Sequence, residues 1–353
     1  MKLTSLRQKV DSIDKAIIEL LNKRANLSLS IRKLKIKKSK GIYSPDREKQ
    51  VLSRLAKTNK GPLNQQAVEA IYREIMSSSL ALGQPLVIAC LGPEASFTHQ
   101  ASLKKFGSLV TYSACDTISE VFNEVEKGNA DYGVVPIENS IEGAVTHTMD
   151  MLVDSDLKIC AQIILEISHN LLSKYDIKSI KKIYSNPQVF GQCRMWLEKN
   201  LPRVECIEVS STAKAAQICT KEKNSGCIAS ILAAKVYGLK VIAKSIEDVP
   251  HNITRFLVIG RDDVGPTGED KTSIMFSIKD KVGALHDMLV PFQKFRINLT
   301  RIESRPSKKK AWDYYFFVDL KGHRQDRNVK LALSILEDKC KYLKILGSYP
   351  VSE

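Results

Sequence analysis

This sequence has no long apolar segment and no recognisable export signal. The longest apolar run near the middle of the chain covers residues 86–91, whereas a membrane-spanning helix needs about 20 such residues. The first residues lead straight into an amphipathic pattern, without an apolar core or a small-residue cleavage site. We therefore expect a cytoplasmic protein that does not interact with a membrane.

The sequence also lacks the residue spacing of a metal site. None of its eight cysteines lies in a CxxC motif or is paired with a histidine at ligand spacing. No two of its six histidines have ligand spacing either, so His147 and His251 are interpreted as structural residues. We expect reduced, mostly buried thiols and neither a metal nor another cofactor.

Positive charge is unevenly distributed along the chain. The net charge is +15, and residues 1–60 hold 17 Lys/Arg against 5 Asp/Glu, a net of +12. Such a segment indicates binding either to nucleic acid or to an anionic small molecule. Binding to single-stranded nucleic acid favours exposed cations interleaved with aromatic residues. Tyr43 is the single aromatic residue in this segment, which favours the small anion.

Apolar residues at the beginning of the chain recur every three or four positions, as they do on one face of a long helix. They are Leu6, Val10, Ile13, Ile17, Leu20, Leu27, Ile31 and Leu34. Arg24 occupies the position that this pattern skips, and Lys35, three turns later, shares its face. A cation in an apolar seam is costly unless an anion or a partner meets it.

Two further helices are expected before residue 84. Ser44 and Pro45 have the residue types of an N-cap and a first helical position, and the apolar stripe of that helix turns Glu48 inward. A third helix is expected from about Asn64 to Gly83, with Ser79 on its apolar face.

These three helices resemble the all-helical chorismate mutases, in which two chains intertwine and share active sites. The resemblance implies that Lys35 meets the ether oxygen of chorismate and Glu48 its ring hydroxyl. It also implies that Arg7 reaches into the site of the neighbouring chain. The substrate-binding residues implied in this domain are Arg7, Arg24, Lys35, Arg47, Glu48 and Ser79. Arginine forks suit the two carboxylates of such a substrate.

Gly83 departs from the pattern of those mutases, which carry Gln or Glu near the end of the third helix. Loss of one hydrogen bond to the ether oxygen costs roughly 3 kcal/mol, or about a hundredfold in rate. The alternative interpretation is that Gly83 is a helix C-cap before Pro85. A monofunctional enzyme with an inactive helical domain therefore remains an alternative.

Short apolar runs alternate with helical patterns from residue 86 to residue 261. The first set of strands is expected at 86–92, 132–137 and 158–165, and the second at 181–185, 206–211, 226–230, 240–246 and 255–260. Helices are expected after Ser96 and from about Glu142 in the first set. Two successive sets predict a two-lobed α/β domain, similar to periplasmic binding proteins, with a cleft between the lobes.

Polar residues concentrate where these strands end and helices begin, at 92–97, 136–140, 210–212 and 252–256. Each segment alone is typical of loops and caps. Together, in this order and spacing, they resemble the motifs of prephenate dehydratase, including VPxENSxEG and the Thr-Arg-Phe segment at 254–256.

The resemblance implies that Thr254 is the central catalytic residue and that Arg255 binds a substrate carboxylate beside it. The remaining implied substrate-binding residues are Ser96, Asn139, Ser140, Ser211 and Thr212. We hypothesise that the Thr254 hydroxyl donates to the departing hydroxyl of prephenate. The sequence leaves open whether Glu138 or Glu142 helps to supply the proton.

A segment rich in Gly, Pro and Asp at 262–270 is typical of a linker. Strands expected at 271–279, 297–305, 312–320 and 341–349, with helices from about Gly283 and over 325–338, give the ferredoxin-like order βαββαβ. This part resembles the amino-acid-binding ACT domain. The resemblance implies an L-phenylalanine site lined by Gly283, Ala284, Leu285, His286, Glu303, Ser304, Arg305 and Pro306. A purely structural dimerisation module is the alternative.

The three resemblances give domains at 1–84, 86–261 and 271–353, in the order of bifunctional chorismate mutase/prephenate dehydratases. This implies chorismate and prephenate as substrates, L-phenylalanine as effector, and a homodimer or a higher even homo-oligomer. A solute-binding protein would carry an export signal and would not need the Thr-Arg-Phe segment. A nucleic-acid-binding regulator would need its cations on an exposed face.

Overall fold

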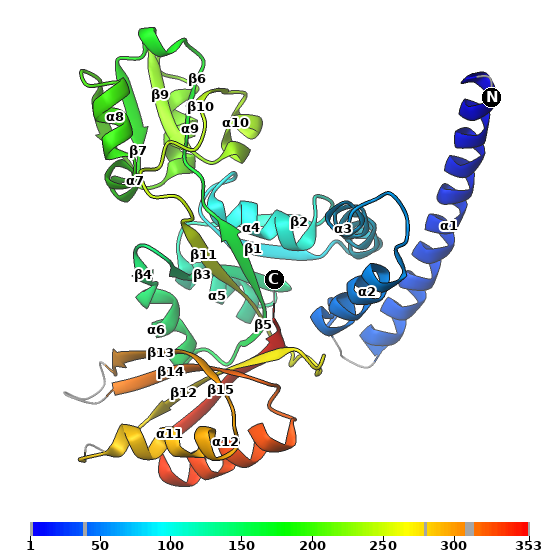
Figure 1. The fold of residues 1–353 in the computed structure, drawn as a ribbon, viewed down its shortest axis with the longest axis vertical. Coiled ribbons are helices and arrows are strands. Elements are labelled where there is room, and N and C mark those ends of the chain that lie inside the picture. Colours follow the sequence, from blue (N-terminus) through cyan, green and yellow to red (C-terminus); the bar gives the residue numbers. More distant parts are fainter. Residues whose placement is uncertain (1–2, 38–40, 279–280, 308–313, 352–353) are drawn as a thin grey trace. The chain divides into compact units, whose positions relative to one another are not determined.

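The computed structural model describes residues 3–37, 41–278, 281–307 and 314–351. The chain divides into two compact units. The first comprises residues 1–86 with 106–111, and the second comprises residues 87–105 with 112–353. Within the described residues, no helix is both long enough and apolar enough to cross a membrane. The expected multidomain architecture is confirmed (Figure 1).

The first unit is all-helical, with α1 (Leu3–Lys37), α2 (Pro45–Thr58) and α3 (Gln65–Ala81). Pro45 begins α2, and Asn64 caps α3 by accepting a bond from the Ala67 amide. Helix α3 ends two residues before the expected Gly83, which adopts a left-handed φ of 85°. Arg32 donates to the backbone carbonyls of Leu80, Leu82 and Gln84, satisfying the end of α3.

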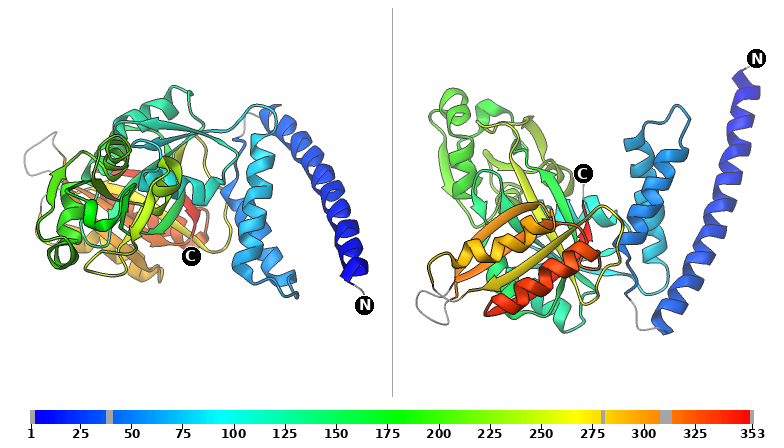
Figure 2. Two further views of the ribbon diagram at one scale, coloured as in Figure 1. Left: turned by 90° about the horizontal axis from the view of Figure 1, so that it is seen from above. Right: turned by 60° about the horizontal axis from the view of Figure 1, so that its bottom comes forward.

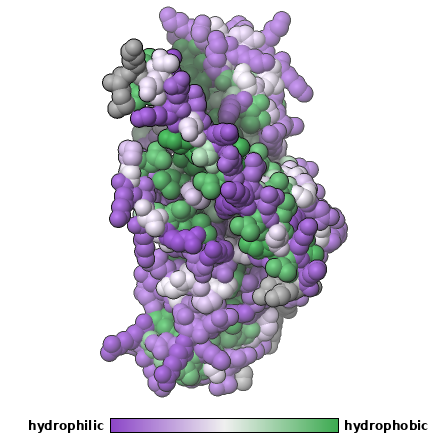
Figure 3. All heavy atoms as spheres, turned by 90° about the vertical axis from the view of Figure 1, so that its right-hand side faces the viewer, coloured by the Kyte–Doolittle hydropathy of each residue, from purple (hydrophilic) through white to green (hydrophobic). Residues whose placement is uncertain are grey.

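The apolar stripe of α1 is largely exposed in the single chain. Leu6, Val10, Ile13 and Ile17 are between 43% and 58% exposed, and the stripe continues in the same state to Leu34. Figure 2 shows the N-terminal half of this helix extending away from α2 and α3. Figure 3, which looks at the side where α1 lies, shows hydrophobic residues at the surface. A helix with an unburied apolar stripe is incomplete as a folded element.

The second unit begins with a lobe whose sheet has the strand order β2-β1-β3-β11-β5, with β4 paired to β3. Its strands are β1 (Val87–Leu91), β2 (Thr111–Cys115), β3 (Tyr132–Asn139), β4 (Gly143–Ala144), β5 (Lys158–Glu166) and β11 (Ile253–Gly260). Its helices are α4 (Phe97–Phe106), α5 (Ile118–Glu126) and α6 (Thr146–Asp154). Helix α6 begins four residues later than expected because β4 intervenes.

A second lobe follows, with the sheet order β10-β6-β9-β7-β8. Its strands are β6 (Asn170–Ser173), β7 (Lys182–Ser185), β8 (Glu205–Glu208), β9 (Ser225–Ala229) and β10 (Lys240–Ala243). Its helices are α7 (Pro187–Gln192), α8 (Arg194–Asn200), α9 (Thr212–Cys219), α10 (Ile231–Tyr237) and the short 3₁₀ helix η1 (Ile177–Ser179).

The assignment of residues 255–260 to the second set of strands is wrong. They form β11, which returns to the first sheet and pairs antiparallel with both β3 and β5. Strands β5 and β11 therefore carry the chain out of the first lobe and back into it (Figure 1). Strand β11 is buried along most of its length, which explains its nearly continuous apolar sequence.

The C-terminal part has the expected order βαββαβ. It consists of β12 (Asp270–Ser277), α11 (Ala284–Lys294), β13 (Leu299–Pro306), β14 (Tyr314–Lys321), α12 (Arg327–Lys339) and β15 (Tyr342–Pro350). The sheet order is β13-β14-β12-β15, with α11 and α12 covering one face. The first two residues of the strand expected at 312–320, Trp312 and Asp313, lie outside the described residues.

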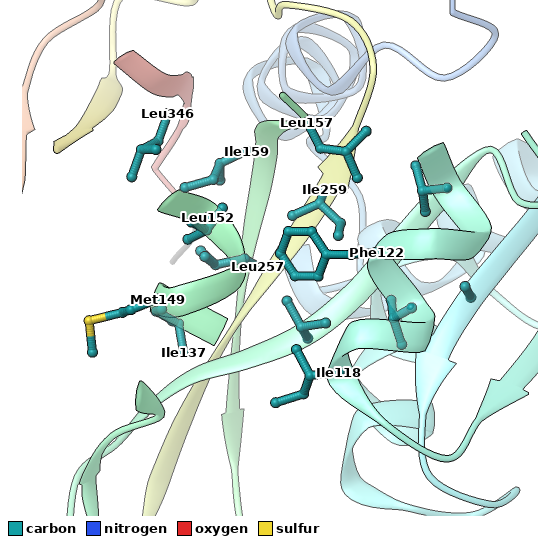
Figure 4. Packing of buried hydrophobic residues seen from close by; sticks show 14 of the residues in the cluster. Ile118, Phe122, Ile137, Met149, Leu152, Leu157, Ile159, Leu257, Ile259 and Leu346 are labelled. Carbon is teal, nitrogen blue, oxygen red and sulfur yellow. The ribbon is translucent and has the colours of Figure 1, made fainter. Parts of the chain in front are cut away.

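The other face of this C-terminal sheet packs on the first lobe. Phe317 and Leu346 belong to the same buried cluster as Phe122 of α5 and Leu257 of β11. Figure 4 shows Leu346 beside Ile159, with Phe122 pointing toward β11. A Cβ atom on Gly347 would lie 2.2 Å from the Ile159 carbonyl oxygen, so β15 passes β5 at a distance that only glycine permits. One core therefore serves both the first lobe and the C-terminal sheet.

Candidate functional site

Thr254 and Asn139 lie directly opposite each other on β11 and β3. The Asn139 amide nitrogen donates to the Thr254 hydroxyl oxygen at 2.8 Å and to Asn252 Oδ1 at 2.6 Å. Since Thr254 Oγ1 accepts this bond, its own hydrogen can be donated to a ligand. Thr254 is 8% exposed, which places that donor in a nearly dry environment where hydrogen bonds are strong.

The orientation of the Asn139 amide is set by the turn that follows β3. Its Oδ1 accepts bonds from the backbone amides of Ile141 at 2.9 Å and Glu142 at 3.0 Å. An Asn side chain that caps its own turn in this way leaves only its NH₂ group for the strand partner. The hydroxyl of Ser140, which is predicted to bind substrate, accepts from the Ile253 amide at 2.9 Å and connects the turn to β11.

A polar network extends from this pair to the second lobe, and sequence reasoning missed its centre, Gln192. Gln192 Oε1 accepts from Asn252 Nδ2 at 3.2 Å and lies 2.8 Å from His169 Nε2. Gln192 Nε2 donates to Glu142 at 3.0 Å. Glu142 and Asn252 lie beside or within the polar segments at 136–140 and 252–256 that the sequence analysis selected. Gln192 was missed because it ends α7 in the other lobe and lies in none of these segments.

His169 is neutral in this network. Burial lowers its pKa, which the bond to Gln192 only partly opposes. Because Gln192 presents an oxygen, His169 Nε2 carries the proton and Nδ1 is left as an acceptor. Nδ1 is buried without a hydrogen-bond partner. Charging this ring would therefore place a second N–H donor, at Nδ1, in a buried position where it has no acceptor.

The predicted substrate residue Ser96 lies in the turn after β1. Its hydroxyl donates to the Leu91 carbonyl at 2.9 Å and accepts from the His99 amide at 3.1 Å, so it shapes the beginning of α4. Ala95 has a φ of 68°. That left-handed conformation costs a non-glycine residue roughly 1 kcal/mol. The Ala95 carbonyl accepts a bond from Ser230 of the second lobe.

Ser211 and Thr212 lie at the beginning of α9 in the second lobe. Ser211 is the N-cap, and its hydroxyl accepts from the Lys214 amide at 3.1 Å. Thr212 follows as the first helical residue and is buried. The first amides of a helix are donors without intrahelical partners, so this end suits an anionic group.

Arg255 requires a correction, because its side chain does not lie beside that of Thr254. Neighbouring residues of a strand point to opposite faces, and Arg255 points toward the C-terminal sheet. Its Nη1 lies 2.6 Å from Asp319 Oδ2 and its Nη2 donates to the Tyr349 hydroxyl at 2.9 Å. Burial opposes its charge, but Tyr349 and Asp319 raise its pKa. The expected substrate carboxylate is therefore replaced by protein partners.

The mutase residues fall into two groups in the helical unit. Arg24 of α1 donates to Ser79 of α3 at 2.7 Å, which brings two predicted residues together. Lys35 donates to the Ile42 carbonyl at 2.9 Å and to the Ser44 hydroxyl. Glu48 accepts from the Tyr43 hydroxyl at 2.5 Å. These contacts join Arg24, Lys35 and Glu48 to groups of the same helical unit.

The other predicted mutase residues lie apart from this cluster. Arg7 is exposed on the unaccompanied half of α1. Arg47 is directed toward Gln50 of its own helix at 3.3 Å. Gly83 lies beyond the end of α3, where no helical side chain could project, in agreement with its interpretation as a capping residue.

The two predicted effector segments lie at the same end of the C-terminal sheet. Tyr315 pairs with Ser277, near the end of β12, and with Arg305, near the end of β13. Gly283, with a φ of 76°, is the N-cap of α11 and is followed by Ala284, Leu285 and the exposed His286. Arg305 is already engaged: it makes two 2.6 Å bonds to Asp150 of α6.

Family models match three successive parts of the chain. Residues 6–84 match chorismate mutase type II, residues 88–264 match prephenate dehydratase and residues 272–338 match the ACT domain. In the described residues, no group of three or more His, Cys, Asp or Glu is arranged to hold a metal ion.

A relative from Aquifex aeolicus, named bifunctional chorismate mutase/prephenate dehydratase, is 50% identical over 99% of this chain and 98% of its own length. A solved prephenate dehydratase from Arthrobacter aurescens, in complex with L-Phe, is 33% identical, with a TM-score of 0.70 over 75% of this chain and 90% of that one. A structure described as GqqA, a novel type of quorum quenching acylase, is 26% identical with the same TM-score over 75% of this chain and 98% of its own.

Proposed function

The chain belongs to the bifunctional chorismate mutase/prephenate dehydratase family, and from this premise we propose that it converts chorismate to prephenate and prephenate to phenylpyruvate, under inhibition by L-phenylalanine. We assign the mutase to residues 1–84, the dehydratase to 86–261 and the regulatory domain to 271–353. The Aquifex relative matches 99% of this chain, and residues 6–84 match the chorismate mutase family model. The match to the acylase covers only 75% of the chain, so the comparisons favour the mutase/dehydratase function.

Thr254 is the centre of the proposed dehydratase reaction. As the carboxylate bonded directly to the ring carbon leaves as CO₂, the electron pair of the broken C–C bond moves through the ring, and the C–O bond to the ring hydroxyl breaks while the pyruvyl side chain keeps its own carboxylate. The departing oxygen needs a donor at that moment. The observation that supports Thr254 is the 2.8 Å bond from Asn139, because it holds the oxygen while leaving the hydroxyl hydrogen for the substrate.

The substrate carboxylates need partners other than Arg255. Ser211 and Thr212, at the beginning of α9, offer hydroxyl groups and helix amides for one of them. The network through Gln192 holds the two lobes in register, since it joins Glu142 of the first lobe to α7 of the second. Neither reaction requires a metal or an organic cofactor, because the first is a rearrangement and aromatisation drives the second.

The proposed mutase site uses Arg24, Lys35 and Glu48 of one chain and Arg7 of a second chain. Arg24 and Lys35 supply charge for a dianion, and Ser79 positions the Arg24 fork. Their contacts with Ser79, Ile42 and Ser44 keep both side chains ordered before substrate arrives. The exposed stripe on α1 supports pairing of two chains, and hence a homodimer or a higher even homo-oligomer. We place the enzyme in the cytoplasm.

L-Phenylalanine is proposed to bind where residues 283–286 and 303–306 meet at one end of the C-terminal sheet. The L-Phe complex of the Arthrobacter relative supports this assignment. Gly283 is the N-cap of α11, and the Ala284 amide already donates to the Lys281 carbonyl at 3.1 Å, so the helix end offers a carboxylate the amides that follow Ala284.

One experiment tests the whole assignment. Purified protein receives chorismate alone, and loss of chorismate and formation of phenylpyruvate are followed with and without L-phenylalanine. We expect phenylpyruvate to form and L-phenylalanine to suppress it. Persistence of chorismate alongside turnover of supplied prephenate would indicate a monofunctional dehydratase. No reaction with either substrate would remove the catalytic proposal.

A further inference from the structure

Two neighbouring residues of β11 face opposite sides of the sheet and have different kinds of partner. Thr254 is bonded to Asn139 of its own lobe, whereas Arg255 is bonded to Asp319 on β14 and Tyr349 on β15 of the C-terminal sheet. The hydrogen bonds of the side chain next to the proposed catalytic residue therefore run to the C-terminal sheet.

The bonds around Arg255 form a closed ring. Asp319 accepts from Arg255 at 2.6 Å through one oxygen and from Ser273 at 2.5 Å through the other. Ser273 is 2.6 Å from the Tyr349 hydroxyl, which in turn accepts from Arg255 at 2.9 Å. Arg255 and Asp319 are only 9% and 5% exposed, and Tyr349 is fully buried. A buried ring of this kind fixes the direction of each member.

A second contact of the same kind reaches the partner of Thr254. Glu138, next to Asn139, lies opposite Arg255 on β3. Its carboxylate is 3.3 Å from Arg301 on β13 and 3.7 Å from Arg255. The two residues adjacent to the Thr254–Asn139 pair thus each have their shortest charged contact on the C-terminal sheet, in addition to the 3.7 Å contact with each other.

This polar ring is not needed merely to hold the domains together. Phe317, Leu346 and Met275 already pack against Leu257 and Ile159 in a shared apolar core. An ion pair buried within such a core contributes little net stability compared with apolar residues of similar size. The ring also fixes the direction of the Arg255 guanidinium, and Arg255 is the residue that follows Thr254 in β11.

The strand ladder is irregular on one side of this segment. The pairing of β11 with β3 shifts register between Arg255 and Phe256, one residue beyond Thr254, whereas the pairing with β5 stays regular from Ile253 to Val258. A bulge interrupts the ladder and allows the strand to bend locally. An added restraint on Arg255 therefore acts on the β3 side, where Thr254 meets Asn139.

We propose that Asp319 is a positioning residue for the dehydratase reaction, holding Arg255 and through it the β11 segment that carries Thr254. This proposal rests on the dehydratase function. In this proposal the C-terminal sheet holds β11 from the face opposite Thr254, through residues other than those proposed to bind L-phenylalanine. A movement of that sheet is then expected to change the position of Thr254 and so the rate of the reaction.

The test compares Asp319→Asn with a matched control in the full-length enzyme. The control is Asp263→Asn, which breaks the 2.7 Å ion pair between Asp263 and Arg324 at a more exposed position beside the same sheet. For Asp319→Asn we expect kcat with prephenate to fall about tenfold to a hundredfold, with KM changed less than about twofold. Asp319→Glu is expected to recover part of the loss, and Asp263→Asn to retain the original rate.

Tyr349→Phe gives a milder perturbation in case Asp319→Asn folds poorly. It removes one acceptor of Arg255 and should lower kcat in the same direction but by less. Equal kcat in Asp319→Asn, Tyr349→Phe and the control would overturn the proposal, as would a change in KM alone.

Hydrogen exchange separates this proposal from the proposed function. We expect the amides of residues 253–256 to exchange faster in Asp319→Asn and at the original rate in Asp263→Asn. If the unmodified enzyme does not convert prephenate, the function fails, but the exchange rates still show whether Asp319 holds β11. Unchanged exchange in Asp319→Asn would overturn the positioning role.

Discussion

The proposed dehydratase and mutase centres differ in how far one chain completes them. Around Thr254, hydrogen bonds run from Asn139 through Asn252 to Gln192, so nearly every polar group has a partner within the same chain. Along α1, the apolar stripe is exposed. Arg24 contacts Ser79 of α3, whereas Arg7 lies more than four helical turns earlier on α1 and takes no part in that contact. The comparison shows that the residues around Thr254 are joined within one chain, whereas the stripe on α1 is not covered by the described residues of the same chain; the proposed pairing of two chains predicts that it is covered on association.

The largest expected effect is at Thr254. Thr254→Ala removes the donor at the departing hydroxyl and should lower prephenate turnover about 10²–10³-fold while leaving chorismate loss unchanged. Thr254→Ser keeps the hydroxyl and should retain much of the rate. Steady-state assays with each substrate measure both reactions. Near-full turnover by Thr254→Ala would remove the threonine from the mechanism.

The mutase centre should show the next largest effect, and it tests whether two chains share it. Arg7→Ala and Arg24→Ala should each lower chorismate turnover about a hundredfold or more, because each removes a partner of the dianion. Mixing the two variants under conditions of subunit exchange should restore about a quarter of the activity, since a mixed dimer contains one intact site. Absence of recovery after verified exchange would place both arginines in one chain's site.

Disruption of the apolar stripe on α1 should abolish the mutase activity but leave the dehydratase activity unchanged. Ile13→Asp combined with Leu20→Asp places carboxylates where a second chain would pack, at a loss of about 1.5–3 kcal/mol for each buried side chain. We expect dissociation in light scattering and loss of mutase activity, with prephenate turnover retained. The control, Gln8→Asp with Lys15→Asp, puts the carboxylates on the opposite face of α1. An unchanged mass in the Ile13/Leu20 variant would exclude pairing through the stripe.

The smallest expected effect is the pH dependence of stability in the second unit. Burial lowers the pKa values of His169 and His99 in the folded state. The unfolded chain therefore binds more protons, so stability is fully present above about pH 6.5 and is lost as the pH falls through and below that value. The slope is at most about 1.4 kcal/mol per pH unit for each histidine.

Thermal unfolding at pH 7.5 and pH 5.5 measures this slope. His169→Gln keeps a hydrogen-bonding side chain and should reduce the difference between the two pH values. The helical unit contains no histidine in its sequence, so its own unfolding should not show this dependence. An equal slope in His169→Gln would mean that His169 is not held neutral by the fold.

The correspondence between sequence and structure is closest where the signal is local. The 3- and 4-residue spacing from Leu6 to Leu34 predicted α1, Pro45 predicted the beginning of α2, and the order βαββαβ was predicted from alternating short runs. Thr254 and Asn139 were singled out by segments that each lie at a strand end. Such features depend on a few residues that are neighbours in the sequence, so they can be predicted from the sequence alone.

What the tertiary structure decided involves residues that are distant in the sequence. The run at 255–260 has the same apolar pattern in either lobe, so only the pairing with β3 and β5 placed it in the first sheet. The face to which Arg255 points follows from that pairing, as does its contact with Asp319, 64 residues away. The role of Gln192 could be recognised only from the structure, which shows its hydrogen bonds to Glu142 and Asn252. The sequence by itself determined most of the elements and the family, although β2, β4 and β6 were not among the expected strands. Packing determined which side chains share a site, because burial and hydrogen bonding act across space and not along the chain.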